Sequence, residues 1–582
     1  MKFRKCDLYC VLLTRSFKFA YRQYKCYNCF NIRAKWMMIV KMKKNTFMEG
    51  AFVATFSILL CKVVGLLYVV PFYSIIGNKG GALYSYAYSI YAIFLSLSTC
   101  GIPIALSKLV SESNALKEYS TREEIYGLSK KMITLFGFIL FLILFIFADK
   151  VAYLFIGNVK GGNTLSDVAM AVRVVSVSLL VVPQLSVTRG YLQGNKMITT
   201  TSISELLEQI VRVVIIVVGS YLLVRKLKLP INYAVYVSIF AATMAALSSY
   251  LYLKLKIHKN KDLFSYDEKN AKKSDVKILL KRIVFYALPF VIIDLVKSLY
   301  GMVDSFTVVK ELVKLGYSAS TAETIFGVIN TWASKLNMIV VSIALGIVTS
   351  LIPNISGSFV KKDMDNVNKR INESYSAILY FSLPMSFGLS FLAQPVWAVF
   401  YGYDLLSVNI FRVYILQAIT FCIYTIALNL AQSLNQSKLA LGALFGSFIF
   451  KIVLNIPMMH FFEFMGIGAY YATIITNILV QGGASIVLLV YLKKKFKFDY
   501  SGNIKPIFKI ISSVIIMLLL LMLLSLVVPL SVASRFKSIL IIALYSVVGA
   551  IIYILMSYKL GLLSDVFGDD YMKKIKKIFL RK

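Results

Sequence analysis

Runs of about twenty apolar residues recur along the whole chain, and these runs limit what it can fold into. A bilayer core about 30 Å thick needs roughly twenty apolar residues of helix to cross it. Hydrophobic residues make up 59% of the 582 residues, above the roughly half that is usual in globular proteins. We predict an all-α integral membrane protein with about fourteen transmembrane helices. The runs lie near 50–76, 84–107, 131–149, 168–190, 203–224, 232–255, 283–309, 328–353, 374–400, 409–433, 439–461, 468–492, 507–530 and 536–558.

A strongly basic gap separates the first six runs from the next six, and two more follow. Two related halves around a central site are a common plan for transporters. We therefore predict two six-helix lobes plus two C-terminal helices. The predicted units are a basic extension (1–41), a first lobe (42–255), a cytoplasmic linker (256–282), a second lobe (283–492), and two spans with a basic cytoplasmic tail (493–582). The extension has a second interpretation, as translated upstream sequence before a native start at Met42.

Short matches between the two halves support an internal repeat. They recur in the same order and at similar separations. Gln193 and Gln432 each lie nineteen positions before a basic residue, Arg212 and Lys451 respectively, and Gly101 begins "GIPIALS" as Gly346 begins "GIVTSLIP".

Lys and Arg outnumber Asp and Glu by 64 to 27. In a water-soluble chain such an excess would indicate a nucleic-acid partner. Here the basic residues lie between apolar runs, so membrane topology explains them and no nucleic acid is expected. Loops assigned to one side hold roughly three to four times the Lys and Arg of the other side, which predicts cytoplasmic N- and C-termini. The basic residues at 225–228 fall on the opposite side and could reach the interface by snorkelling.

Charged residues inside apolar runs are candidates for function, because each costs about 2.5–3.5 kcal/mol at the bilayer centre. Lys62 lies in the middle of the first run and Lys335 near the start of the eighth. Asp294, Lys297 and Asp304 share one helical face of the seventh. In one interpretation, Asp294 and Lys297 neutralise each other. In the other, this face lines a cavity where Lys297 meets a negative substrate, while Asp304 orients it or accepts a coupling cation.

The fifth run carries Glu205, Glu208 and Arg212 at helical spacing. Glu208 and Arg212 form a favourable pair four residues apart, so the group is either structural or a gate near the cytoplasmic mouth. Lys451 and Asn455 are typical of polar contacts between membrane helices. The sequence contains no glycine-rich phosphate-binding motif, and we expect neither a cofactor nor a metal.

Four segments, taken in order, carry a resemblance to a known family. They are "CKVVGLLYVVPFYSIIG", "RGYLQGNK" followed by "SISELLEQIVRV", "VDSFTV", and "ASKLNMIVVSIALGIVTSLIP". With them the chain resembles, over about 42–558, the polysaccharide-flippase branch of the multidrug, oligosaccharidyl-lipid and polysaccharide exporter superfamily. That branch contains lipid II flippases of the MurJ type and the stage V sporulation protein B group. The resemblance implies a multi-pass transporter of the bacterial cell membrane that is not an enzyme.

In such flippases a basic residue three before a glycine in the first span, and another just before a leucine in the eighth, face a cationic central cavity. Lys62 before Gly65 and Lys335 before Leu336 stand at these positions. A further basic residue of the first-span motif is replaced here by Tyr68. The two extra C-terminal spans also fit this branch, where such a pair lines a groove for a lipid tail.

The resemblance implies a polyprenyl-diphosphate-linked sugar as substrate, such as the peptidoglycan precursor lipid II or a related cell-envelope or spore-cortex precursor. Lys62, Lys335 and Lys297 would attract the diphosphate, and the halves would rock to expose the site on alternate sides. Coupling to the membrane potential or to a monovalent cation stays open. The expected partners are the lipid-linked sugar, membrane lipids and cell-wall synthesis proteins.

Two alternatives stay open. A cation-coupled multidrug exporter of the same superfamily would need carboxylates in its cavity, for which Asp294 and Asp304 are the candidates, whereas Lys62 opposes it. A membrane enzyme that ligates or polymerises lipid-linked glycans would need a sizeable outer loop with an acid, a base or a metal site. The predicted outer loops are short, which disfavours the enzyme.

Overall fold

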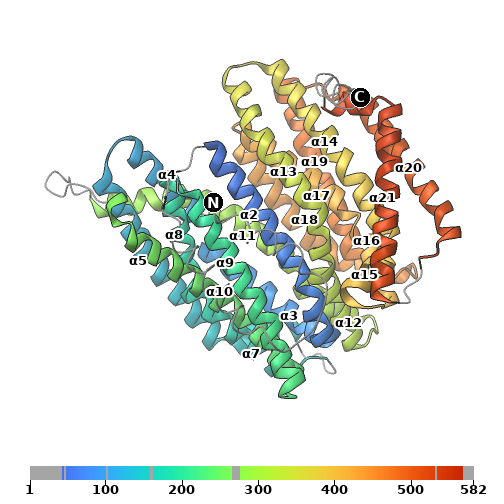
Figure 1. Cartoon of the computed structure of the whole chain (residues 1–582), viewed down its shortest axis with the longest axis horizontal. Coiled ribbons are helices and arrows are strands. Elements are labelled where there is room, and N and C mark those ends of the chain that lie inside the picture. Colours follow the sequence, from blue (N-terminus) through green and yellow to red (C-terminus); the bar gives the residue numbers. More distant parts are fainter. Residues whose placement is uncertain are drawn as a thin grey trace, which may run out of the picture.

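The computed structural model describes Met42, Lys44 and residues 47–99, 102–157, 162–264, 275–530 and 534–567. Regular structure in these ranges is helical throughout (Figure 1), as the apolar runs predict. The predicted extension, residues 1–41, lies outside the described residues. The helices are α2 (Phe47–Leu67), α3 (Val69–Thr99), α4 (Ile102–Ala115), α5 (Tyr119–Ile146), α6 (Ala148–Ile156), α7 (Leu165–Ser176), η1 (Val177–Leu180), α8 (Val182–Gly194), α9 (Ile198–Val214), η2 (Ile215–Gly219), η3 (Leu222–Lys226), α10 (Ile231–Lys259), η4 (Lys261–Leu263), α11 (Val276–Lys314), α12 (Ala319–Gly327), η6 (Val328–Trp332), α13 (Ala333–Val360), α14 (Met364–Phe391), α15 (Ala393–Tyr401), α16 (Leu405–Tyr414), α17 (Gln417–Ser433), α18 (Ser437–Phe464), α19 (Tyr470–Phe496), η7 (Ser501–Asn503), α20 (Ile504–Val527), α21 (Arg535–Lys559) and α22 (Leu562–Phe567).

Polar side chains cap the start of several helices. The Asp275 carboxylate accepts a hydrogen bond from the backbone N–H of Lys277 and begins α11 seven residues before the apolar run predicted at 283. Thr164 and Asp167 cap each other's backbone N–H groups at the start of α7. These caps satisfy donors that the first helical turn leaves unpaired. Several helices therefore extend beyond their apolar runs.

The long helices pack into two groups that lie side by side (Figure 1). We call α2 to α10 the N-terminal bundle and α11 to α19 the C-terminal bundle. Within the first, α2 packs on α9; within the second, α11 packs on α18 in the same way. Helices α20 and α21 pack on each other and on the outer edge of the C-terminal bundle, through α14 and α15. There the Tyr553 hydroxyl donates to the Tyr380 carbonyl oxygen at 2.8 Å.

The same tight turn recurs at corresponding places in the two bundles. In each turn a residue with φ near +60° donates its N–H to the carbonyl three residues back, and the next residue donates to the carbonyl five residues back. This is the Schellman pattern that ends helices. Two of the turns centre on Lys117 and Lys362, each sixteen residues after the glycine that begins its matching segment, Gly101 or Gly346. The other two centre on Lys196 and Asn435, each three residues after the matching glutamine, Gln193 or Gln432. The repeat noticed in the sequence therefore coincides with repeated geometry.

Ten helical segments of the described chain are long and apolar enough to cross a bilayer. The number rises to twelve if each of two bent pairs is one crossing: 60–67 with 69–93, bent by 48°, and 364–391 with 393–401, bent by 75°. The chain is thus a multi-pass helical membrane protein, and the total of fourteen crossings stays a prediction.

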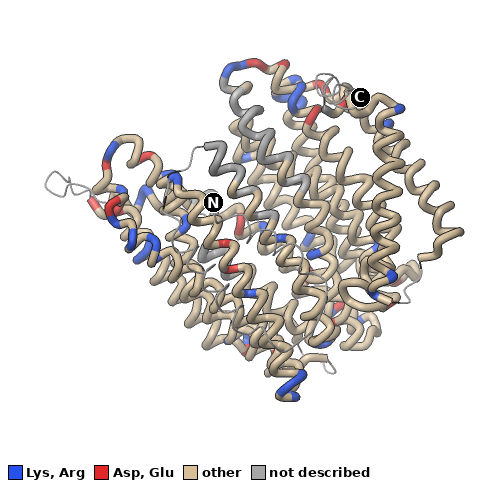
Figure 2. Tube along the Cα trace, viewed as in Figure 1, with Lys and Arg blue, Asp and Glu red and all other residues tan. Residues whose placement is uncertain are grey.

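Charged residues gather at the ends of the helices, and only a few lie along their middles (Figure 2). Lys117, Lys196, Lys362 and Lys497 all lie at turns with positive φ, after α4, α8, α13 and α19. We call the end of the molecule that carries these turns the basic end. Figure 1 shows α7, α12 and α15 at the opposite end.

Candidate functional site

Two lysines join α2 to α13, where the two bundles meet. We call this contact, with Lys62 on one side and Lys335 on the other, the α2–α13 seam. Lys62 of α2 donates to the Ser342 hydroxyl of α13 at 2.9 Å. Lys335 of α13 donates to the Tyr68 hydroxyl at the end of α2, also at 2.9 Å. Seven residues separate Lys335 from Ser342, so their Cα atoms lie about 10 Å apart along α13, and the two lysine contacts lie at different levels of the seam. The structure thus brings the two principal predicted residues to one seam.

Aromatic rings surround the Lys335 ammonium. Its Nζ lies 4.8 Å from the ring centroid of Tyr68, 5.3 Å from that of Tyr84 and 4.9 Å from that of Trp332. Such contacts attract a cation to the faces of the rings, most strongly where water is excluded. Trp332 is 1% exposed and Tyr68 is 7% exposed, so this cage is buried. Tyr68 stands where the resemblance leads us to expect a basic residue, and here its hydroxyl accepts a hydrogen bond from Lys335 of the other bundle.

Neither lysine has a negative partner in the described part of the chain. No described carboxylate lies within 4 Å of the Lys62 or Lys335 Nζ, although many other basic groups here do form ion pairs. Both lysines are partly buried, and a charge withdrawn from water inside a membrane protein without a counter-ion is costly and is usually retained for function. The seam therefore offers two unneutralised positive charges to an anionic ligand.

Beside Lys62 lies an open pocket of about 330 Å³ between α2, α8 and α9. A Cβ atom at Gly65 would meet the terminal amide of Gln209 at 2.9 Å, so α2 and α9 approach closely at this glycine. The pocket is lined by Cys61, Lys62, Arg189, Glu205, Glu208 and Gln209.

Glu208 lies at the centre of the predicted gating group. It accepts a hydrogen bond from Arg189 at 2.9 Å and pairs with Arg212 one helical turn away. Arg189 also donates to the hydroxyls of Ser204 and Ser249, which ties α8, α9 and α10 together. Glu205 faces the same pocket as Lys62. The predicted Glu208 to Arg212 pair is present, and Arg189 is the member that the sequence did not indicate.

Among the described residues, no ion pair connects the charged residues of α11 to the α2–α13 seam. Lys297 lies 3.8 Å from Asp294 and remains 56% exposed. Asp304 forms a buried ion pair of 2.7 Å with Lys451 of α18, and Asn455 donates to its other carboxylate oxygen at 3.3 Å. The Asp304 carboxylate is therefore neutralised within the C-terminal bundle. Lys451 and Asn455 make the interhelical contacts that the sequence predicts for them.

The two bundles are fastened together at the end opposite the basic end. Glu323 of α12, 2% exposed, accepts hydrogen bonds from the backbone and side-chain N–H groups of Asn163 at 2.8–3.0 Å. A Cβ atom at Gly162 would collide with the Glu323 carboxylate at 2.4 Å, so the loop can approach only as glycine. Nearby, the Asn330 side chain donates to the Ser89 hydroxyl at 2.5 Å. We call these two contacts, Glu323 to Asn163 and Asn330 to Ser89, the bundle latch.

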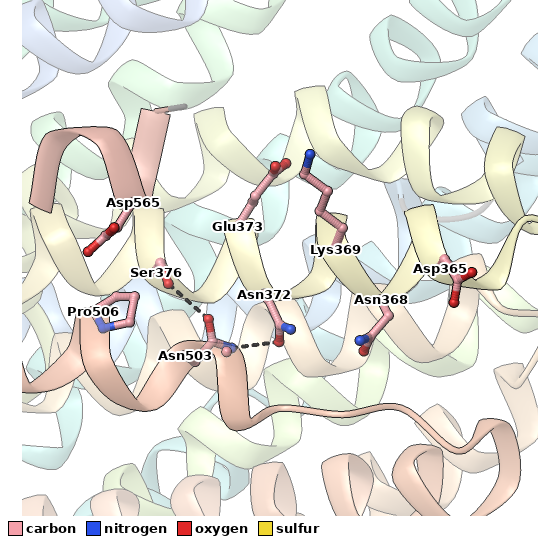
Figure 3. Close-up of a pocket in the computed structure, with 10 residues that line it drawn as sticks. Asp365, Asn368, Lys369, Asn372, Glu373, Ser376, Asn503, Pro506 and Asp565 are labelled. Atoms are coloured by element: carbon pink, nitrogen blue, oxygen red, sulfur yellow. Dashed lines mark hydrogen bonds between the residues drawn. The ribbon is translucent and has the colours of Figure 1, made fainter. Parts of the chain in front are cut away.

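A second pocket, of about 470 Å³, lies where α14 meets η7, α20 and α22 (Figure 3). Ser376 donates to Asn503 at 2.9 Å, and Asn503 donates to Asn372 at 2.8 Å, as the dashed lines in Figure 3 show. Among its acidic residues, Glu373 pairs with Arg370 and Asp565 with Lys509. These contacts attach the last helices to the C-terminal bundle. Within the described ranges no group of three or more His, Cys, Asp or Glu is placed to hold a metal ion.

Comparison with known proteins identifies the family. The family model described as "Polysaccharide biosynthesis protein" matches residues 47–359, from the start of α2 almost to the end of α13. The chain belongs to this family. Its placement in the flippase branch of the multidrug, oligosaccharidyl-lipid and polysaccharide exporter superfamily, expected from the sequence, is confirmed.

Curated relatives come from the same branch. The chain is 28% identical over 534 residues to the lipid II flippase MurJ of Bacillus subtilis (strain 168), covering 90% of this chain and 96% of that protein. It is 24% identical over 365 residues to stage V sporulation protein B of the same organism, covering 61% of this chain and 66% of that protein. The family is one of transporters, not of enzymes, as predicted.

Solved structures share the fold. A lipid II flippase MurJ in an inward closed conformation superposes with a TM-score of 0.63 at 16% identity, over 90% of this chain and all of that one. An inward-facing multidrug transporter of the MATE family superposes with a TM-score of 0.62 at 12% identity, over 75% of this chain and 94% of that one. The all-helical transporter architecture is therefore common to both groups.

Proposed function

We propose that this family member is a flippase that moves a polyprenyl-diphosphate-linked sugar from the inner to the outer leaflet of the bacterial cell membrane. The proposed cargo is lipid II or a related cell-envelope or spore-cortex polysaccharide precursor. The observation that carries the proposal is the pair Lys62 and Lys335, which lie on facing helices of the two bundles with no ion pair to any described carboxylate. The 28% identity to a lipid II flippase over 90% of the chain supports it independently.

The chemistry of the cargo matches this seam. A diphosphate carries negative charge on several oxygens, and lysine ammonium groups bind phosphate as point charges. The two lysine contacts lie at levels of α13 about 10 Å apart, which suits a ligand that extends along the seam rather than a single small ion. The isoprenoid tail would stay in lipid, beside the pair α20 and α21. Lys297, 56% exposed on α11, is a third candidate contact.

In the proposed cycle the basic end faces the cytoplasm, with both termini inside and fourteen crossings in total. Two six-helix lobes, matching the two bundles, would rock against each other. The described conformation would then be closed on the outer side by the bundle latch. An anionic head group entering from the cytoplasm would draw Lys335 out of its cage and weaken the contact between α2 and α13. Glu208, with Arg189 and Arg212, would act as the inner gate.

The membrane potential could supply the driving force. Outward movement of one negative charge across an inside-negative membrane gains about 2.3 kcal/mol per 100 mV. A coupling cation would need a carboxylate that is not already paired. Asp304 is neutralised by Lys451, which makes Glu205, in the Lys62 pocket, the stronger candidate for that role. Association with cell-wall synthesis proteins stays a prediction.

Depletion of the protein tests the assignment in cells. The proposal predicts that a polyprenyl-diphosphate-linked precursor accumulates on the cytoplasmic leaflet. A plasmid copy carrying Lys62→Ala or Lys335→Ala should fail to relieve the block although the protein reaches the membrane. Wild-type rescue by both variants, or no accumulation of any lipid-linked precursor, would sink the proposal.

A second candidate is a cation-coupled multidrug exporter, favoured by the structural likeness to a MATE transporter. Such a protein would use Glu205 in the Lys62 pocket to hold an organic cation. Efflux of ethidium from loaded cells separates the two. The exporter predicts efflux that Glu205→Gln abolishes, whereas the flippase predicts no efflux above the depleted strain.

A further inference from the structure

A groove on the outside of the N-terminal bundle has the form of a site for an amphiphile. It has a volume of about 560 Å³ and lies between α5 and the segment that runs from η1 into α8. It does not include any residue of the α2–α13 seam. It is lined by Lys130, Lys131, Thr134, Leu135, Phe138, Leu180 and Gln184.

The groove lies where α5 changes from polar to apolar. From Tyr119 to Lys131 the helix carries Arg, Glu, Ser and Lys, and from Met132 to Ile146 it has no charged residue. Such a boundary marks the level at which a membrane helix leaves the headgroup region and enters hydrocarbon. Lys130 and Lys131 stand at that boundary.

Charge and apolar surface are ordered along the groove. Lys131, Leu135 and Phe138 lie on one face of α5 at steps of four and three. Leu135 is 62% exposed and Phe138 is 47% exposed, so apolar surface continues for about 10 Å below the lysine. A phosphate with the first carbons of an acyl chain has this same order of charge and hydrocarbon.

The described residues do not neutralise the lysines of the groove. No described carboxylate forms an ion pair with Lys130 or Lys131, and Lys130 lies 5.9 Å from the Tyr250 ring, as does Lys254 of α10. A cluster of basic side chains between helices at the headgroup level is how membrane proteins hold anionic lipid head groups.

The walls of the groove are held at fixed spacing. A Cβ atom at Gly137 would lie 2.6 Å from the Leu179 carbonyl oxygen, so α5 and η1 approach as closely as a glycine permits. This contact lies beside Phe138 and Leu180, at the apolar floor of the groove. The groove is thus fixed by backbone packing and does not depend on surface side chains alone.

We propose that this groove binds an anionic glycerophospholipid of the surrounding leaflet, with its phosphate on Lys130 and Lys131 and an acyl chain along Leu135 and Phe138. The bound lipid is a structural partner and is separate from the transported cargo, whose site is the α2–α13 seam. The proposal does not depend on which molecule the seam transports.

Photo-crosslinking in nanodiscs tests the site on the full chain. Nanodiscs of zwitterionic lipid would contain a trace of phosphatidylglycerol or phosphatidylcholine with a diazirine in the acyl chain. We expect phosphatidylglycerol to label peptides that span 130–138 and 180–184. At about 1 kcal/mol per basic residue, each of Lys130→Gln and Lys131→Gln should lower that labelling about fivefold.

Two matched variants distinguish lipid binding in the groove from general electrostatic attraction of the lipid to the protein. Lys150→Gln removes an exposed lysine beside an exposed aromatic ring, Phe147, after the other end of α5, and should leave labelling unchanged. Thr134→Trp fills the groove at an exposed position while keeping both lysines, and should abolish labelling. The proposal would be overturned by equal labelling with the two lipids. It would also be overturned by wild-type labelling of a variant that carries both Lys130→Gln and Lys131→Gln, or by wild-type labelling of Thr134→Trp.

Discussion

Lys335 Nζ lies 2.9 Å from the Tyr68 hydroxyl, although the two residues belong to different bundles and are 267 positions apart in the chain. The same contact that holds the ammonium also holds α2 against α13. A ligand that takes Lys335 from Tyr68 therefore changes how the bundles are joined, so substrate binding and conformational change share one interaction. The predictions below follow from this relationship and from the bundle latch.

Cross-linking at the bundle latch should stop transport. Ser89 of α3 and Asn330 of η6 are in hydrogen-bond contact at 2.5 Å, so cysteines at both positions in a cysteine-free chain should join through a short bifunctional thiosulfonate reagent. Because the link holds the opposite end shut, translocation should fall to background and return on reduction. Cysteines at Asn114 and Asn195, 3.0 Å apart within the N-terminal bundle, form the matched control and should cross-link without loss of transport. Full transport by the linked Ser89 and Asn330 variant would rule out rocking about this latch.

Tyr68→Phe should shift the protein away from the described conformation. The substitution keeps the ring of the cage and removes the hydroxyl that accepts from Lys335. A hydrogen bond to a charged group is worth about 1.5–3 kcal/mol, so the equilibrium constant between the closed and open conformations should shift toward the open one by at least about tenfold. The rate of cross-linking between cysteines at positions 89 and 330 measures the closed population. Tyr558→Phe, at a 54% exposed ring on α21, is the control and should have no effect.

Glu323→Gln should weaken the bundle latch at its other contact, between Glu323 and Asn163. The carboxylate accepts three hydrogen bonds from Asn163, and an amide at this position would turn an N–H toward those donors. The loss of charged acceptors for a buried backbone N–H costs about 1–3 kcal/mol. We expect slower cross-linking at positions 89 and 330 with the protein still folded. Glu118→Gln, exposed at the basic end, controls for the change of charge, and equal rates in all three proteins would contradict the assignment.

The pair Asp304 and Lys451 should stabilise the C-terminal bundle. Removing one partner leaves a buried charge alone, so Asp304→Asn or Lys451→Met should cost about 3–5 kcal/mol. The double variant should recover most of this loss, because neither charge remains. Unfolding followed in detergent measures the three stabilities. A double variant that is stable but fails to transport would show that the pair has a role in the cycle beyond holding α11 to α18.

The sequence predicted the architecture more fully than the site. Apolar runs and the placement of Lys and Arg depend only on local composition, so the helical membrane fold and Lys62 and Lys335 as candidates could be inferred from them. The family followed from the resemblance that the four segments carry. The repeat could be inferred at Gln193 and Gln432, because the turns that follow them are local structures.

Contacts between distant helices could not be inferred in this way. The cage of Tyr84 and Trp332 around Lys335, the partner of Glu323, and the role of Arg189 depend on which helices meet, and nothing in the local pattern specifies it. One signal was present for the cage: Tyr68 replaces a basic residue of the family motif. Asp304 was predicted to orient a substrate or to accept a coupling cation, whereas the structure pairs it with Lys451 on α18.

Headgroup translocation in vesicles tests the central claim most directly. Purified protein would be reconstituted with a fluorescent polyprenyl-diphosphate-linked sugar, and a membrane-impermeant quencher would report the fraction of head groups on each face. We predict that an imposed potential speeds equilibration above that of empty vesicles. We also predict that Lys62→Gln combined with Lys335→Gln returns the rate to that of empty vesicles, while Lys150→Gln leaves it unchanged. Translocation by the double lysine variant at the wild-type rate would contradict the account.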